Sequence, residues 1–289
     1  MPESPHLAAR PADFVALTKP RLNFLVVAST LAGYYLAAEG FRPALLFHTV
    51  VGTALVAGGA SAFNQVFERD TDALMRRTRM RPLPDRRMPV ATATWFAATL
   101  SVAGLAQLAW GANPLAAVIA LVTLASYALV YTPLKSRTAF ATLVGGVPGA
   151  LPPMIGWAAA SGTLTIEAWV LFAIVFLWQM PHFLAIAWLF QEDYARAGLP
   201  MLPVVEPDGR STAQQVVLYA AVLVPVSLLP TIVGLSGRVY LVGATVLGIG
   251  FLALGIRFAL QRNRVNAKRL FLGSITYLPL LWGLMLGNH

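Results

Sequence analysis

The chain has 289 residues, of which 57% are hydrophobic and only 11% are charged, and its formal net charge is +9. An ordinary soluble domain carries about 25% charged residues, so this composition excludes a water-soluble fold, and its high hydrophobicity excludes intrinsic disorder. The chain contains no cysteine, which excludes disulfides and thiolate metal sites. The composition is that of a polytopic membrane protein.

Nine apolar segments predict an all-α membrane protein with nine transmembrane helices. Each segment has about 18–25 residues, enough to cross the hydrocarbon core of a bilayer. The segments cover residues 21–38, 44–66, 91–110, 113–131, 138–160, 166–190, 212–234, 238–259 and 268–286. We expect residues 1–289 to form one intramembrane domain. Residues 1–20 would be a cytoplasmic N-terminal segment, and 67–90 and 191–211 would be inner catalytic loops.

The basic residues predict the orientation of these helices. All of them except Arg42 and Arg238 fall on the side of the N-terminus when the nine segments alternate across the bilayer. The positive-inside rule therefore predicts a cytoplasmic N-terminus. Because the charges lie between apolar segments and form no soluble face, we expect no nucleic-acid partner.

Three oxygen-bearing side chains follow one another at helical spacing where the second segment ends. At about 100° per residue, Asn64, Glu68 and Asp72 share one face of a helix, whereas Asp70 points elsewhere. Carboxylates held close together repel unless a cation lies between them, and an oxygen-rich site without cysteine suits Mg²⁺. The alternative is that these acids only mark the membrane boundary.

An arginine-rich loop follows the acids. Its members are Arg76, Arg77, Arg79, Arg81, Arg86 and Arg87. Carboxylates followed by guanidinium groups suit a metal–diphosphate group, because the metal bridges phosphate and carboxylate oxygens while arginines bind the remaining oxygens. Taken alone, the arginine cluster is better explained by membrane topology. A smaller basic loop contains Lys135 and Arg137 after Tyr131, and it either binds phosphate or is an ordinary inner loop.

The sixth segment carries a histidine within its apolar stretch. An ionisable residue in such a place is a functional candidate, so His182 either contacts a haem-like ligand, transfers a proton, or bonds a neighbouring helix. If the helix continued past the segment, Asp193 would face the same way as His182, with an offset of about 20°. Pro181 predicts a kink beside the histidine. Trp178 either faces a ligand or packs in the core.

These patterns together resemble the UbiA-type intramembrane prenyltransferases. The likeness rests on Asn64-x-x-x-Glu68-x-x-x-Asp72, on Tyr131-x-x-x-Lys135, and on an acidic motif after the sixth helix. Further segments resemble the branch of that family that farnesylates haem b. They are Leu17–Arg21, Arg77–Pro84, Pro181–Phe183 and Asp193–Pro203. Two positions depart from the wider family, since Glu68 replaces an Asp and Phe190 stands where the first Asp of the second motif is expected.

The resemblance implies a UbiA-like helical bundle and an activity. Farnesyl diphosphate would be joined to the vinyl group of haem b with addition of water, giving haem O and diphosphate. It implies Mg²⁺ as cofactor and haem A synthase as a partner for terminal oxidase assembly. The short acidic N-terminal segment favours the bacterial inner membrane over the mitochondrial inner membrane as the location. The rivals left open are a prenyltransferase for a quinone-type aromatic acceptor and a transporter of an anionic solute.

The resemblance also implies roles for individual residues. The residues implied in catalysis are Asn64, Glu68, Asp72, Asp193 and His182. Those implied to hold Mg²⁺ are Asn64, Glu68, Asp72, Asp193 and Glu192. Those implied to contact phosphate oxygens are Arg77, Arg81, Tyr131, Lys135 and Arg196. Those implied to contact haem are His182, Trp178, Lys19 and Arg21, although Lys19 and Arg21 would otherwise only anchor the first span.

Overall fold

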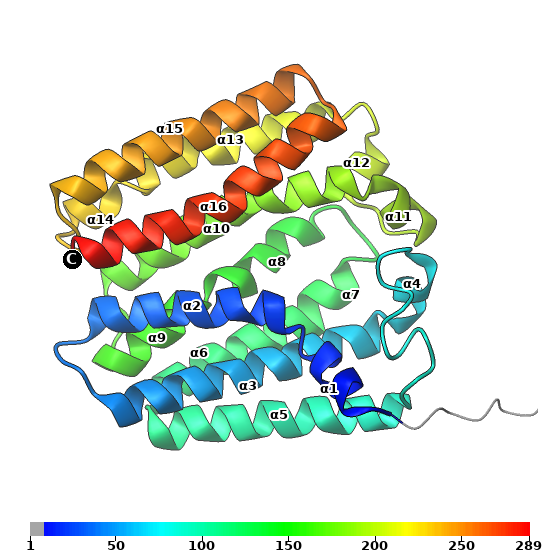
Figure 1. Ribbon diagram of the computed structural model, residues 1–289, viewed down its shortest axis with the longest axis horizontal. Helices are drawn as coiled ribbons and strands as arrows, with labels where there is room; N and C mark the ends of the chain where they lie inside the picture. The colour runs from blue at the N-terminus through cyan, green and yellow to red at the C-terminus, as the bar shows by residue number, and fades with distance from the viewer. Residues whose placement is uncertain (1–8) are drawn as a thin grey trace, which may run out of the picture.

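The computed structural model describes residues 9–289 and contains only helices and connecting turns over that range (Figure 1). Residues 1–8 of the predicted N-terminal segment lie outside the described residues. The remainder of that segment includes a short helix, α1 (Pro11–Leu17). The predicted all-α fold is confirmed for the described residues.

The other helices follow the predicted segments. They are α2 (Pro20–Ala37), α3 (Pro43–Phe67), α4 (Arg69–Leu74), α5 (Val90–Gly111), α6 (Pro114–Ala125), the π-helical turn η1 (Ser126–Tyr131), α7 (Thr132–Leu134), α8 (Ala141–Ala150), α9 (Pro152–Ser161), α10 (Ile166–Leu189), α11 (Gln191–Arg196), α12 (Leu202–Val205), α13 (Arg210–Val226), α14 (Leu229–Ile232), α15 (Arg238–Leu260) and α16 (Arg264–Gly287).

Within residues 9–289, eight helical stretches are long and apolar enough to cross a membrane, and each matches a predicted span. The first predicted span corresponds to α2, which has 18 residues and is not among those eight. The count of nine spans and the side of the N-terminus therefore stay predictions. Large apolar side chains such as Trp95 and Trp110 are 75% and 89% exposed on the outside of the bundle. The chain is a multi-pass membrane protein.

The prolines interrupt fewer helices than their positions suggest. The fifth predicted span does break, because α8 ends at Ala150 and α9 begins at Pro152. By contrast, α10 runs through Pro181 and α16 runs through Pro279 without ending. An interior proline removes one backbone hydrogen bond, and packing of both helices against neighbours keeps the rest of the ladder in place.

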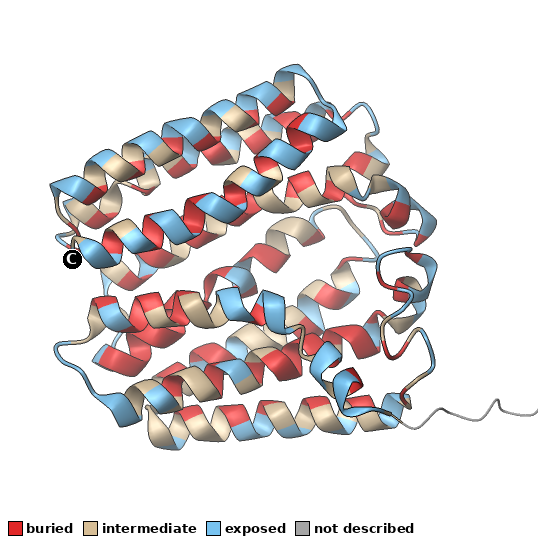
Figure 2. Cartoon of the chain, viewed as in Figure 1, coloured by how far each residue is buried: buried red, intermediate tan, exposed pale blue. Residues whose placement is uncertain are grey.

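Close helix packing builds the bundle around its site. Helices α2 and α9 pack at glycines: a Cβ on Gly33 would overlap the Pro153 carbonyl, and one on Gly156 would overlap that of Thr30. Small residues at such crossings let backbones approach closely. Helices α13, α15 and α16 pack on α10 or on each other as a second group (Figure 1). Buried residues line the faces that meet neighbouring helices, whereas the outer faces are exposed (Figure 2).

Two long helices end in the same way at one end of the bundle. Helix α3 breaks at Glu68 and is followed by the six-residue α4, while α10 breaks at Phe190 and is followed by the six-residue α11. Both short helices lie at the same end of the molecule (Figure 1). Each carries acidic residues in its first turn. The ends of the second and sixth predicted spans are therefore built alike.

Candidate active site

The three predicted oxygen-bearing side chains are buried around the break between α3 and α4. Asn64, Glu68 and Asp72 are 3%, 8% and 0% exposed, whereas the side chain of Asp70 is 84% exposed, as its helical position predicts. The helix ends at Phe67, but the backbone N–H of Glu68 still donates to Asn64 and that of Asp72 to Glu68. These bonds preserve the helical register across the break. We call Asn64, Glu68 and Asp72 the oxygen cluster.

Each member of the oxygen cluster has a cationic partner. Lys19 Nζ donates to Asn64 Oδ1 at 2.7 Å, and Lys135 Nζ donates to both carboxylate oxygens of Glu68 at 3.0 and 3.1 Å. Arg81 Nη1 donates to Asp72 Oδ2 at 2.6 Å. The two carboxylates therefore do not repel one another, because three basic side chains compensate them. Lys135 and Arg81, which the resemblance implies as phosphate contacts, thus lie beside the acids, and their role toward phosphate stays a prediction.

One oxygen of the cluster has no partner. Asp72 Oδ1 is buried and makes no hydrogen bond with any described residue. Leaving a carboxylate oxygen unpaired away from water costs free energy, so such an atom marks a site that a ligand completes. No group of three His, Cys, Asp or Glu side chains within residues 9–289 is placed to hold a metal ion by itself. Mg²⁺ fits this donor set if the amide oxygen of Asn64 and substrate phosphate oxygens complete it.

The charges at this site shift several pKa values. Burial and the positive charge of Arg81 lower the pKa of Lys19 to about 7. Burial opposes ionisation of Glu68, but the ammonium groups of Lys135 and Lys19 hold its pKa below the usual value. Burial likewise opposes charge on Lys135, yet the Glu68 carboxylate raises its pKa. Glu68 and Lys135 therefore form an ion pair at neutral pH.

Lys19, which donates to Asn64 of the oxygen cluster, has a strained backbone. Its φ angle is 48°, in the left-handed region that lysine rarely adopts. Neighbouring side chains hold this turn: Asn23 donates to the Thr18 carbonyl, and Gln65 of α3 donates to those of Ala16 and Leu17. Strained residues that the fold maintains often mark functional sites. Arg21, the other predicted haem contact, is exposed.

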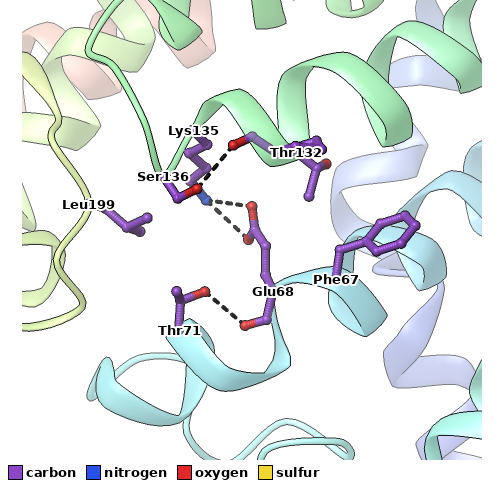
Figure 3. A pocket seen from close by; sticks show the side chains of 8 residues that line it. Phe67, Glu68, Thr71, Thr132, Lys135, Ser136 and Leu199 are labelled. Atoms are coloured by element: carbon purple, nitrogen blue, oxygen red, sulfur yellow. Dashed lines mark hydrogen bonds and ion pairs between the residues drawn. The ribbon is translucent and has the colours of Figure 1, made fainter.

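A cavity of about 250 Å³ opens beside the ion pair of Glu68 and Lys135 (Figure 3). Its lining residues are Phe67, Glu68, Thr71, Thr132, Pro133, Lys135, Ser136 and Leu199. The Glu68 and Lys135 side chains point toward one another there. Thr132 accepts a hydrogen bond from the amide of Asn64 at 3.3 Å. The π-helical turn η1 precedes Thr132 and ends in Tyr131, which stacks on Tyr127 at 5.5 Å.

The second acidic motif meets the arginine loop. Asp193 Oδ1 accepts hydrogen bonds from the backbone N–H of Arg76 and from the Arg196 guanidinium. Arg77 donates to the Tyr194 hydroxyl at 2.9 Å and lies over the rings of Phe190 and Tyr194. The loops 67–90 and 191–211 therefore lie against each other.

Glu192 and Asp193, the predicted acids of the second motif, form no hydrogen bond or ion pair with the oxygen cluster. Glu192 is exposed on α11 and makes no hydrogen bond or ion pair with a described residue. Helix α10 does not continue to Asp193, because Phe190 leaves the helical conformation. The helical alignment of His182 with Asp193 was conditional on a continuous helix, so it stays a prediction. Phe190 instead packs its ring beneath Arg77.

His182 lies between aromatic rings on the side of α10 that faces α16. Its ring stacks on Trp178 and on Phe271, with centroids 5.3 and 5.2 Å away. Its Nδ1 lies 2.7 Å from Ser274 Oγ, and Trp178 Nε1 donates to the Ser274 carbonyl at 2.8 Å. The imidazole is thus held in one orientation.

Four residues at the oxygen cluster and around His182 could not be identified from the sequence. Thr132 and Gln65 are common polar residues near helix ends, and their roles depend on contacts with distant segments. Ser274 and Phe271 lie in an ordinary apolar segment, 92 and 89 positions after His182. Only the packing of α10 on α16 brings them together.

A family model and several known proteins match this chain. The model of the UbiA prenyltransferase family matches residues 26–282. The chain belongs to the UbiA prenyltransferase family. The oxygen cluster and its three basic partners thus lie in an intramembrane prenyltransferase.

Several known proteins resemble this chain in sequence or in fold. A protein of Solibacter usitatus named protoheme IX farnesyltransferase is 51% identical over 284 residues, covering 95% of this chain and 97% of that protein. A structure of digeranylgeranylglyceryl phosphate synthase has a TM-score of 0.81 at 16% identity, covering 96% and 97% of the two chains. A UbiA homolog from Archaeoglobus fulgidus bound to GPP and Mg²⁺ has a TM-score of 0.65 at 14% identity, covering 94% and 99%. The two structural matches establish the fold alone.

Proposed function

We propose that this UbiA-family protein transfers a farnesyl group from farnesyl diphosphate to a vinyl group of haem b, with addition of water, and releases diphosphate and haem O. The observation that carries the proposal is 51% identity, over nearly the whole chain, to a protein named protoheme IX farnesyltransferase. The site supports it with an oxygen cluster at the α4–α11 end and an aromatic histidine site farther along α10. We place the protein in a bacterial inner membrane, with haem A synthase as the partner that receives its product.

The residues of the oxygen cluster would bind the diphosphate. Asn64, Glu68 and Asp72 would hold Mg²⁺, whose positive charge would stabilise the departing diphosphate. Lys19, Lys135 and Arg81 already surround these oxygens, and they can donate to phosphate oxygens when the diphosphate arrives.

Other basic residues would support the same step from the loops. Arg77 and Arg196 lie on the two loops that meet at Asp193, and we assign both to the diphosphate. Tyr131 ends the π-helical turn beside the cavity, and we assign its hydroxyl to the same group. Donors placed in advance where negative charge develops lower the barrier to bond cleavage.

The second half of the reaction needs an acceptor held away from bulk water. His182 and Trp178 lie among buried residues of α10 and α16, and we assign them to haem b. Loss of diphosphate leaves an allylic cation, which the vinyl carbon attacks. The cation formed next to the macrocycle is then trapped by water, whose oxygen stays in the product and whose proton leaves.

The test is mass spectrometry of haem extracted from membranes that contain this chain. We expect a product heavier than haem b by one farnesyl group plus one hydroxyl group. A parallel incubation with 4-hydroxybenzoate and farnesyl diphosphate tests the quinone-type rival, and prenylation of the phenol alone would refute the proposal. A transporter would release no diphosphate in either incubation.

A further inference from the structure

The hydrogen bonds around His182 define which ring nitrogen carries the proton. Ser274 Oγ lies 2.6 Å from the carbonyl oxygen of Phe271 and 2.7 Å from His182 Nδ1. A carbonyl oxygen can only accept, so the single hydroxyl hydrogen of Ser274 is donated to Phe271. The hydroxyl oxygen is then left to accept from His182. Nδ1 must therefore carry a hydrogen.

This protonation leaves the other nitrogen free. A neutral imidazole has one N–H, so a hydrogen on Nδ1 gives Nε2 a lone pair. Nε2 makes no hydrogen bond with any residue in the described range 9–289, and it is not among the fully buried polar atoms without partners. It is thus a base of fixed direction that is not fully buried, because the bond to Ser274 and the stacking on Trp178 and Phe271 hold the ring.

Ser274 is itself held firmly. Its side chain is fully buried, and its carbonyl accepts the indole N–H of Trp178 at 2.8 Å. The network therefore runs from Trp178 through the Ser274 backbone and hydroxyl to the imidazole. It joins α10 to α16 at the histidine.

We propose that Ser274 is a positioning residue that fixes His182 with its hydrogen on Nδ1, so that Nε2 ligates the iron of the haem substrate. This rests on the proposed function, since it assumes that haem b is the acceptor. Neutral imidazole nitrogen is a common iron ligand. A hydrogen bond from the opposite N–H orients such a ligand and raises its basicity. Ser274 would act through His182 and would not touch the substrate.

The test uses the full-length protein in lipid nanodiscs, titrated with haem b and observed by absorption and resonance Raman spectroscopy. Ser274→Ala should weaken haem binding by about 10- to 100-fold and shift the iron–histidine vibration. Ser274→Thr, which keeps the hydroxyl, should restore both. The matched control is Ser101→Ala, because Ser101 is also buried and bonds a helix carbonyl, but on α5. The KM for farnesyl diphosphate should stay within about twofold in all three variants, because the hydrogen bonds of Ser274 join it to α10 and α16 and not to the oxygen cluster.

A measurement on the unmodified protein keeps the proposal testable if Ser274→Ala does not fold. Nitrogen NMR of histidine-labelled protein distinguishes the two tautomers, and the His182 signals are assigned by their loss in His182→Gln. We expect a protonated Nδ1 and an unprotonated Nε2. The reverse assignment overturns the proposal, as does a wild-type haem spectrum that His182→Gln leaves unchanged. If haem binds through His182 but is never farnesylated, the proposed function fails and the assignment of Ser274 stands.

Discussion

Replacing Asp72 by Asn removes one negative charge from the oxygen cluster while it preserves the size and shape of the side chain. Asp72 has one oxygen paired with Arg81 and one buried oxygen without a partner. If the unpartnered oxygen binds Mg²⁺ together with the diphosphate, Asp72→Asn weakens the group that stabilises the leaving diphosphate. Removing a comparable electrostatic group costs about 2.7–4 kcal/mol, so kcat should fall by about 10²- to 10³-fold.

The same change should have little effect on folding. The Arg81 side chain is 27% exposed, so water can solvate its guanidinium when the carboxylate is lost. The amide oxygen of Asn can still accept from Arg81, so the pair loses its charge but keeps a hydrogen bond. An amide group also tolerates the unpaired position better than a charged carboxylate does. We therefore expect activity to be lost from protein that remains folded.

The assay measures diphosphate release and haem product in nanodiscs, with thermal unfolding followed in parallel. The matched control is Asp70→Asn, two positions away, because the Asp70 side chain is 84% exposed and pairs with no residue in the range 9–289 other than Arg69. Asp70→Asn should change kcat by less than about twofold, as surface changes usually do. Equal loss in both variants, or full activity in folded Asp72→Asn protein, would refute the assignment of the oxygen cluster.

Three further outcomes follow from the same contacts. Lys19→Met should raise the KM for farnesyl diphosphate by about tenfold, because it removes a charged donor to the site. The control Arg21→Met, at an exposed position, should leave that KM unchanged. Equal KM values for the two variants in steady-state assays would contradict this prediction. Treatment with EDTA should abolish turnover, and added Mg²⁺ should restore it. The unfolding temperature should stay unchanged, because Arg81 and Lys135 already compensate the carboxylates of Asp72 and Glu68. Turnover that persists in EDTA would argue against a role for Mg²⁺. Gly156→Ala should lower the unfolding temperature by several degrees, because the added Cβ would overlap the Thr30 carbonyl. An unchanged unfolding temperature in a thermal scan would show that α2 and α9 separate easily.

Much of the fold could be predicted because apolar length is a strong signal. The membrane fixes how many apolar residues a spanning helix needs, so eight predicted spans match long helices within a few residues at their ends. The internal prolines were harder to interpret. A proline at the start of a new helix, such as Pro152, looks the same in sequence as Pro279 inside a continuous helix. The difference depends on packing with neighbours.

The site was predictable where its residues share one helix and not where they meet across helices. The spacing of Asn64, Glu68 and Asp72 held because backbone hydrogen bonds keep their register past the break. The position of Lys19 could not be predicted, because it follows from a left-handed turn held by Asn23 and Gln65. The order of charges along the chain says nothing of which cation meets which acid.

The three basic partners of the oxygen cluster bear on the order of events in turnover. To bind Glu68 as well as the unpartnered oxygen of Asp72, a lone magnesium ion must displace Lys135 from its carboxylate with nothing else for that cation to bind. A magnesium–diphosphate complex offers the displaced cation a phosphate oxygen at the same moment. The metal should therefore enter together with the isoprenoid and leave together with the inorganic product, after which the ion pairs re-form and the resting enzyme holds no magnesium between cycles.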